Sequence, residues 1–284
     1  MKIIHDQLPD VKVIITGSSS LELADGVTEP LTGRKIVFDL YPISYLELSS
    51  LLNPFELNDS LETRLIYGSY PEIFSIENSE KKRNFLLELS GSYLYKDILQ
   101  LATIKKSNKI QDLLRLLAYQ VGSEVSLNEI GSGLDLDKET VARYIDLLEK
   151  SFVIFRIGGF NRNLRKEVTK MDKIYFYDLG IRNIVIDNFK LLKERNDIGQ
   201  LWENFLIIER MKYIEYKRKY AAKYFWRTYT GAELDYIEES NDVLSGYEFK
   251  WGNKKKNVPF IWKQTYPNAE FKLINRENFL SFIT

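Results

Sequence analysis

The chain has 284 residues with no cysteine and one histidine, His5, so disulfides and thiolate metal sites are excluded and histidine catalysis has almost no basis. Because 40 basic residues balance 40 acidic ones, any nucleic-acid contact needs a local basic surface, and any bound metal ion needs oxygen ligands. No apolar run approaches the ~20 residues that span a bilayer, which predicts a cytoplasmic protein of two or three domains without membrane contact.

Two apolar runs near the N-terminus predict parallel β-strands. Residues 11–17 read VKVIITG and residues 35–40 read KIVFDL, and the segment between them is interpreted as a short helix. Such a strand–helix–strand unit is half of a parallel α/β sheet. Two strands cannot form a sheet alone, so we expect self-association through the unpaired apolar edge, or local disorder of residues 1–45.

A helical middle segment and a winged helix-turn-helix follow. Leu, Phe and Tyr recur at helical spacing from Tyr45 to about Leu101. Three further helices are predicted at residues 108–122, 126–134 and 137–151, and two wing strands at 152–159 and 172–180. Ser126 and Asp137 are expected to cap the second and third of these helices.

The segment between the two wing strands is basic. It carries Arg162, Arg165, Lys166 and Lys170, in a tip of the kind that contacts phosphates. A solvated loop is an alternative of comparable weight, because the third helix also carries four acidic side chains. Winged helices also serve as protein-interaction spacers, so the partner of this module stays open between DNA and protein.

The last segment predicts a strongly amphipathic helix and a meander of strands. The helix covers residues 198–218, and the strands cover 222–230, 232–239, 244–252 and 269–284. This order is typical of an α+β or α/β layer. The run Lys254 to Lys256 is interpreted as a solvated loop, although its nearness to Lys250 would suit a rim that follows a phosphate backbone.

Two of these strands carry charged residues where a sheet favours Val and Ile. Glu233 and Asp235 share one face, as do Glu248 and Lys250 on the next strand. If the strands pair, the carboxylates cluster and one pKa rises unless a divalent cation compensates. Asp235 and Glu248 would then hold Mg²⁺ while Lys250 orients water or stabilises developing charge. Glu203 could supply another ligand, whereas the alternative is an exposed cross-strand ion pair.

The order of the segments resembles a prokaryotic AAA-type ATPase family whose C-terminal domain of unknown function is similar to PD-(D/E)XK nucleases. The resemblance rests on VIITGSSSLEL, LTGRKIVFDLYPISYLE, IYFYDLGIRN, LWENFLIIE, FWRTYTGAELDYI and GYEFKW. It implies a multidomain α/β protein: a partial AAA ATPase core with a helical lid at residues 1–102, a winged helix at 103–195 and a PD-(D/E)XK nuclease-like domain at 196–284.

The resemblance also implies roles for individual residues. Thr16 and Ser18 correspond to the polar sensor position of AAA ATPases, and Arg34 to the arginine that reaches a neighbouring subunit's nucleotide. The matching positions of the nuclease-like domain are Glu203, Glu233, Asp235, Glu248 and Lys250, with Arg227 and Thr228 in support. Without a nucleotide Arg34 could be a surface residue, and Arg227 could simply pair with Glu233 across neighbouring strands.

The sequence departs from the family at its nucleotide site. Neither the phosphate-binding loop G-x-x-x-x-G-K-[ST] nor an acidic Mg²⁺-binding strand precedes residue 11. We therefore interpret the chain as N-terminally truncated, and expect ATP, the cofactor of intact members, not to bind this chain alone. In another possibility, a second chain supplies the nucleotide site and Arg34 acts in trans.

Two functions remain open. In the first, the protein acts on DNA, with Mg²⁺-dependent phosphodiester hydrolysis in the nuclease-like domain. In the second, it is a non-catalytic module that binds DNA or protein, and the nuclease-like domain is a scaffold.

Overall fold

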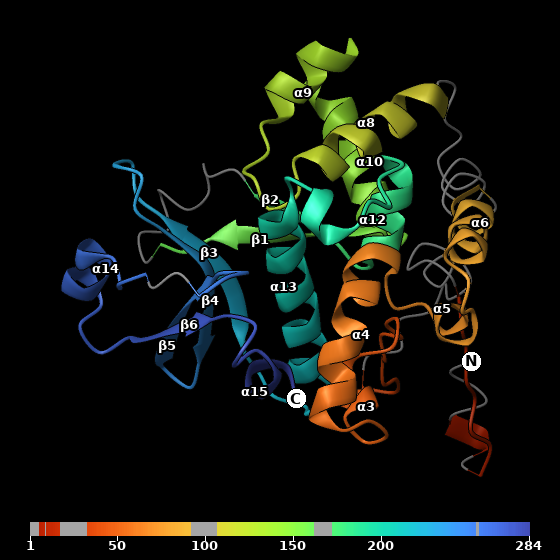
Figure 1. Cartoon of the computed structure of the whole chain (residues 1–284), viewed down its shortest axis with the longest axis horizontal. Helices are drawn as coiled ribbons and strands as arrows, with labels where there is room; N and C mark the ends of the chain where they lie inside the picture. Colours follow the sequence, from red (N-terminus) through yellow and green to blue (C-terminus); the bar gives the residue numbers. More distant parts are fainter. Residues whose placement is uncertain (1–5, 9, 18–32, 92–106, 162–171, 254–255) are drawn as a thin grey trace.

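The computed structural model describes residues 6–8, 10–17, 33–91, 107–161, 172–253 and 256–284. It has a mixed α/β architecture, with a helical middle and a six-stranded mixed sheet (Figure 1). The helices before the first strand are α3 (Tyr45–Leu48), α4 (Pro54–Tyr67), α5 (Pro71–Ser75), α6 (Ser79–Leu89), α8 (Ser107–Tyr119), α9 (Leu127–Leu134) and α10 (Lys138–Lys150). The later helices are α12 (Leu179–Val185), the 3-10 turn η2 (Leu192–Glu194), α13 (Ile198–Tyr216), α14 (Phe260–Thr265) and α15 (Leu280–Ile283).

The sheet joins the predicted wing to the predicted C-terminal meander. Its strands are β1 (Ile154–Gly159), β2 (Lys173–Phe176), β3 (Ala222–Arg227), β4 (Glu233–Ser240), β5 (Val243–Phe249) and β6 (Glu270–Ile274). The spatial order is β2-β1-β3-β4-β5-β6. The pairs β1–β3 and β5–β6 are parallel, and the other three are antiparallel. Because Gly158 stands opposite Tyr224, the β1–β2 pair and the C-terminal meander form one continuous sheet.

The β4–β5 hairpin is closed by a two-residue turn at Asn241–Asp242. Both turn residues have positive φ, 49° and 63°, and Ser240 pairs with Val243 at the end of the strands. Two-residue turns with positive φ match the twist of paired strands, and Asn and Asp tolerate that conformation. The turn therefore fixes the register in which Tyr236 stands opposite Tyr247, so Asp235 and Glu248 are the next residues along the two strands.

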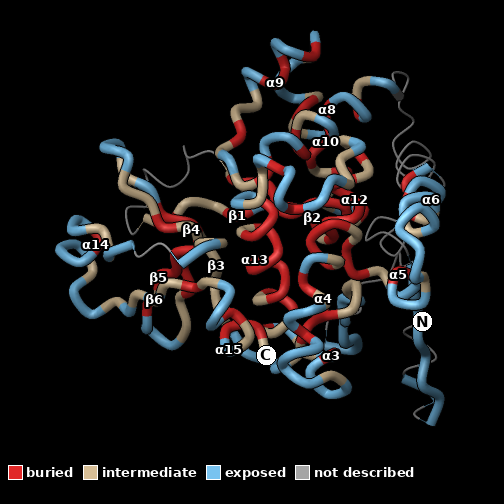
Figure 2. Tube along the Cα trace, in the orientation of Figure 1, coloured by how far each residue is buried: buried red, intermediate tan, exposed pale blue. Residues whose placement is uncertain are grey.

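Helix α13 lies at the centre of the molecule. It runs between the sheet and the helices α4 and α12 (Figure 1), and most of its trace is buried (Figure 2). Trp202 is fully buried and stacks on Phe205, with the rings 5.6 Å apart. The predicted helix is present, but the prediction that it is strongly amphipathic is wrong. Helix α13 is buried on most sides, as expected for a helix packed between two layers. In the part of the chain that the structure describes, no helix is long and apolar enough to cross a bilayer.

The two predicted N-terminal strands are wrong. Within the described residues, 11–17 and 35–40 form no strand, and their apolar side chains face solvent. Ile14 is 88% exposed and Leu40 is 97% exposed. Residues 6–8 and 10–17 extend away from the body of the molecule (Figure 1). Among the described residues no strand offers hydrogen bonds to these runs, so their β-propensity has no sheet to join there.

Asn204 on α13 ties the helix to strand β2, and its loss should destabilise the fold. Its fully buried side chain accepts a hydrogen bond from the Phe176 N–H and donates one to the Phe176 carbonyl, both at 2.8 Å. Asn204→Leu leaves two buried backbone groups unpaired, so we expect a loss of about 2–4 kcal/mol in the free energy of unfolding. Urea unfolding followed by circular dichroism measures it, and exposed Gln200→Ala on the same helix should change stability by under ~0.5 kcal/mol. Equal losses in both variants would contradict the prediction.

Candidate functional site

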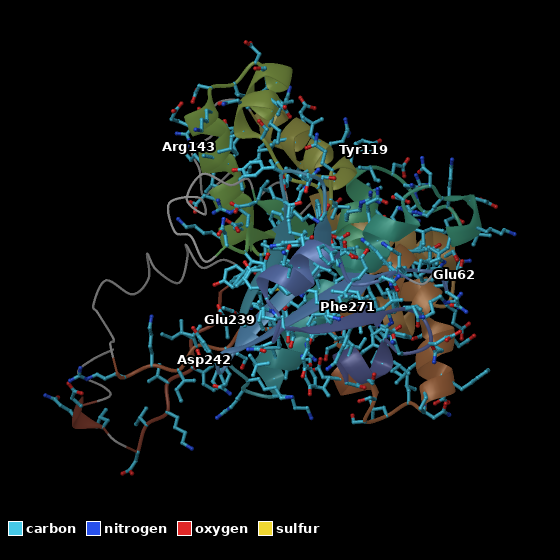
Figure 3. The ribbon with its side chains drawn as sticks, turned by 90° about the vertical axis from the view of Figure 1, so that its left-hand side faces the viewer. Glu62, Tyr119, Arg143, Glu239, Asp242 and Phe271 are labelled. Carbon is cyan, nitrogen blue, oxygen red and sulfur yellow. The ribbon has the colours of Figure 1, made fainter. Side chains whose placement is uncertain are left out.

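The three helices α8, α9 and α10 and the strand pair β1–β2, predicted as a winged helix-turn-helix, are present with the predicted caps. The Ser126 side chain accepts a hydrogen bond from the Glu129 N–H at 3.3 Å, and Asp137 accepts one from the Thr140 N–H at 2.7 Å. Arg143 of α10 lies in the upper part of the molecule and Asp242 of the β4–β5 turn in the lower part (Figure 3). The basic residues predicted to contact nucleic acid are Arg162, Arg165, Lys166 and Lys170, which lie outside the described residues.

The residues predicted at the nucleotide position are spread along the N-terminal segment. Thr16 is exposed, and Ser18 lies outside the described residues. Arg34 Nε donates to Asp6 Oδ1 at 2.9 Å, and both side chains are more than one-third exposed. Arg34 thus forms a surface ion pair within this chain, which is the kind of pair that contributes little to stability.

A carboxylate cluster lies where α13 crosses strands β4 and β5. Glu248 is 1% exposed on β5, and Asp235 on β4 accepts a hydrogen bond from the Phe249 N–H at 2.7 Å. Burial, together with the nearby charges of Glu203 and Glu248, raises the pKa of Asp235 to about 7. Burial also raises the pKa of Glu203. The structure therefore brings together the three carboxylates predicted as metal ligands, from one helix and two strands.

Lysines neutralise this cluster from two sides. Lys173 Nζ lies 2.6 Å from Glu233 Oε1 and 3.4 Å from Glu203 Oε1. On the other side, Lys250 and Lys256 lie 2.6 and 2.5 Å from Glu248 Oε1. Although burial opposes it, the charges of Glu203 and Glu233 raise the pKa of Lys173. The cluster is therefore a network of alternating charges.

Sequence reasoning missed two residues of the cluster, Lys173 and Tyr175. The Tyr175 hydroxyl donates to Glu203 Oε1 at 2.6 Å, and Lys173 and Tyr175 both lie on β2. The signal that could have found Lys173 is a charged residue at the start of the otherwise apolar run KIYF, because lysine is almost never buried without a partner. Tyr175 carried no such signal.

Arg227 has a partner other than the one predicted. It stands opposite Glu233 in the register of β3 and β4, but its guanidinium lies 3.6 Å from Glu124 Oε2. The carboxylate of Glu233 binds Lys173 instead. Arg227 thus links strand β3 to the connection between α8 and α9, at the border of the cluster.

The donor set around Asp235 and Glu248 fits a hard cation in part. The Glu248 Oε2 atom is buried and has no hydrogen-bond partner, and oxygen ligands are those that Mg²⁺ prefers. Within the described ranges, however, no group of three or more acidic, His or Cys side chains is arranged to hold a metal ion. Lysine nitrogens stand beside the carboxylates instead. Asp235 and Glu248 therefore offer a two-carboxylate site whose remaining ligands would be water or substrate.

Asp235→Asn is expected to stabilise the fold at neutral and higher pH. Asp235 ionises at an ordinary pKa of 3.8 when unfolded and at about 7 when folded, so between these values the folded state binds the additional proton. Stability therefore falls as pH rises from about 4 to 7, and neutral Asn removes this loss. We expect a gain of about 1–4 kcal/mol near pH 8.

Urea unfolding in metal-free buffer, compared at about pH 4 and about pH 8, checks this gain. Asp242→Asn in the exposed β4–β5 turn is the matched control and should show no such pH-dependent gain. A variant at position 235 that is less stable than the parent near pH 8 would contradict the prediction.

Comparison with known families gives three matches along the chain. Residues 1–49 match the model of an AAA domain. Residues 58–191 match a domain of unknown function (DUF8612), and residues 198–268 match another (DUF4143). The predicted AAA relationship is therefore confirmed for the N-terminal part, and the predicted C-terminal domain of unknown function is confirmed, whereas its nuclease-like character stays a prediction.

Curated proteins similar to this chain carry the description "uncharacterized protein". One from Mycobacterium tuberculosis is 27% identical over 254 residues, covering 88% of this chain and 54% of that protein. One from Methanocaldococcus jannaschii is 24% identical over 264 residues, covering 87% of this chain and 57% of that protein. The chain thus spans about half the length of the curated relatives it matches. No solved structure gives a significant match.

Proposed function

We propose that the carboxylate cluster is a divalent-cation-dependent site for phosphodiester hydrolysis in DNA. The observation that supports it best is the placement of Asp235 and Glu248 on the adjacent strands β4 and β5, with Lys250 Nζ 2.6 Å from Glu248 Oε1. Two buried carboxylates beside an accessible lysine provide cation ligands and a positive charge for a phosphate. A bound Mg²⁺ would polarise the phosphate and lower the pKa of a bound water.

Each residue has a role in this proposal. Asp235 and Glu248 bind the cation, and the unpartnered Oε2 atom of Glu248 is available for it. The Lys250 ammonium, 37% exposed, faces the phosphate and stabilises the charge that develops on it. Arg227 is about half exposed and contacts a neighbouring phosphate. Glu203 and Glu233 keep their contacts with Lys173.

The DNA would be held by basic residues joined to the same sheet. Strands β1 and β2, which flank residues 162–171 in the sequence, belong to the sheet that carries Asp235. Contacts from Arg162, Arg165, Lys166 and Lys170 to phosphates would then anchor DNA relative to the cluster. Lys256, 39% exposed, extends the positive surface beside Lys250.

A second candidate is a non-catalytic module that binds DNA or protein, with this sheet as scaffold. The observation that favours it is the pairing of Glu233 and Glu248 with lysines, which neutralises the cluster without any cation. In that case Asp235 and Lys250 contribute to the fold or to binding, and not to a reaction.

The experiment is a cleavage assay on supercoiled plasmid DNA with Mg²⁺ or Mn²⁺, with a chelator as the blank. If the cluster hydrolyses phosphodiesters, the parent nicks DNA only when the cation is present, and Asp235→Asn abolishes this nicking. The DNA affinity of the variant, measured by fluorescence anisotropy, stays within about threefold of the parent's. The matched control Asp242→Asn should cleave like the parent. No cleavage by the parent, with equal DNA affinity in all three proteins, would favour the scaffold.

We also propose self-association through the exposed apolar runs at residues 11–15 and 36–40. Ile14 and Phe38 are 88% and 71% exposed, and extended apolar segments without partners pair with one another. Sedimentation should show a concentration-dependent dimer or larger species. Ile14→Lys with Phe38→Lys should lower the association constant at least about tenfold. Leu87→Lys, at an isolated exposed position of α6, is the control, and a parent that is monomeric at high concentration would contradict the proposal.

A further inference from the structure

Lys173 is a buried cation inside the carboxylate cluster. Its side chain is 4% exposed, and its Nζ lies 2.6 Å from Glu233 Oε1 and 3.4 Å from Glu203 Oε1. It also lies 5.3 Å from the centre of the Phe225 ring. An ammonium taken from water to this depth needs compensating charges, and the two glutamates provide them. Lys173 therefore cannot leave its position without leaving buried charges unpaired.

The backbone around Lys173 is fixed by the winged-helix part of the chain. Strand β2 pairs with β1, and residue 173 also forms a β-bridge with Glu124. The Gly122 N–H donates to the Ile174 carbonyl at 3.1 Å. Gly122 has φ +76°, and a Cβ there would lie 3.2 Å from Glu203 Oε1. The ammonium and the glutamate are therefore packed closely against a connection that admits only glycine without strain.

The carboxylate of Glu203 contacts two side chains of β2. Its Oε1 atom accepts from the Tyr175 hydroxyl at 2.6 Å and lies 3.4 Å from the Lys173 ammonium. Tyr175 and Lys173 are two residues apart on the strand, so their side chains lie on one face. These contacts hold Glu203 against β2.

The other half of the cluster differs in accessibility. Lys250 and Lys256, which bind Glu248, are 37% and 39% exposed. Exposed ammonium groups exchange a carboxylate for water at little cost, since surface ion pairs are weak. Glu248 also has the buried oxygen Oε2 without a hydrogen-bond partner. An external cation can therefore reach Asp235 and Glu248 by displacing only exposed lysines.

We propose that Lys173 is a built-in cation that fills the Glu203–Glu233 half of the cluster, so that the chain binds one divalent cation, at Asp235 and Glu248. Glu203 is then a positioning residue that holds Lys173, and not a metal ligand. A second divalent ion at Glu203 and Glu233 is repelled by the buried ammonium. This inference rests on the proposed cation site, but it concerns how many ions that site takes.

The test is a Mn²⁺ titration of the DNA-free chain, with unbound Mn²⁺ measured by electron paramagnetic resonance. The parent should bind one Mn²⁺, and Lys173→Met, which removes the charge but keeps the length, should bind two. Lys173→Arg, which restores a cation, should return the count to one. Two ions bound by the parent, or one bound by a folded Lys173→Met variant, would overturn the inference while leaving the cation site in place. No Mn²⁺ binding by the parent would overturn the proposed function and this inference together.

Glu203→Gln keeps the test decisive if Lys173→Met does not fold. The amide oxygen of Gln can still accept from Tyr175 and Lys173, so the fold is preserved. Because Glu203 is not a ligand in this proposal, Mn²⁺ affinity should stay within about threefold of the parent. Asp235→Asn should lower it by at least about tenfold under the same conditions. A loss in Glu203→Gln as large as that in Asp235→Asn would make Glu203 a ligand and overturn the inference.

Discussion

Lys250→Met is expected to reduce divalent-cation-dependent DNA cleavage by about 10²–10³-fold, because it removes the charge that stabilises the transition state. The position of this lysine is fixed by the sheet, since its N–H donates to the Ile274 carbonyl of β6 at 3.0 Å. Its ammonium lies 2.6 Å from Glu248 Oε1, and its side chain is 37% exposed. The substitution should therefore change the free energy of unfolding by under ~0.5 kcal/mol.

Single-turnover cleavage with saturating DNA measures this effect apart from binding. Lys272→Met is the matched control, because Lys272 is an exposed lysine on β6 of the same sheet, paired with Glu270. It should cleave at the parent's rate. Lys250→Arg should recover part of the rate if only the positive charge matters. A Lys250→Met variant that cleaves as fast as the parent would remove Lys250 from the mechanism.

Asp197→Ala is expected to cost about 3–5 kcal/mol of stability, the largest loss among the variants considered, because it leaves two buried guanidinium groups without their counter-ion. Asp197 stands just before α13 and contacts Arg182 Nη1 at 2.5 Å and Arg195 Nε at 2.8 Å. Arg182 also donates to the Ala118 carbonyl at 2.8 Å. One carboxylate therefore ties together α8, α12 and the start of α13.

The same carboxylate predicts a pH dependence. Although burial opposes it, hydrogen bonds from Arg195 and Arg182 lower the pKa of Asp197 from 3.8 to about 2. A carboxyl whose pKa is lower in the folded state stabilises the fold above its unfolded pKa, and this contribution is lost as pH falls toward 2. The stability difference between Asp197→Ala and the parent should therefore be full near pH 7 and shrink below about pH 4.

Urea unfolding at these two pH values checks both statements. Asp59→Ala, an exposed carboxylate of α4, is the control and should change stability by under ~0.5 kcal/mol at either pH. A loss at position 197 as small as that at position 59 would show that the two guanidinium groups find other partners.

Several local features could be predicted because they depend on a few neighbouring residues. A helix cap needs only a side chain and an N–H three residues later, as at Ser126 and Asp137. The pairing of Asp235 with Glu248 could be predicted because a short turn joins the two strands and alternation then sets the faces. The state of residues 11–17 and 35–40 could not be predicted from their sequence, because an apolar run forms a strand only where a neighbouring strand exchanges hydrogen bonds with it.

The sequence by itself determined the order of helices α8, α9 and α10 and of strands β1 to β5, the starts of the capped helices and the meeting of the acidic strands, since each follows from short-range contacts. Only the tertiary structure decided that β1 pairs with β3 and that Lys173 and Tyr175 reach Glu203. Those contacts join residues far apart in the chain, and they form because burying α13 and extending the sheet bring the segments together. A buried lysine needs partners close in space, and no local sequence pattern specifies which residues those partners are.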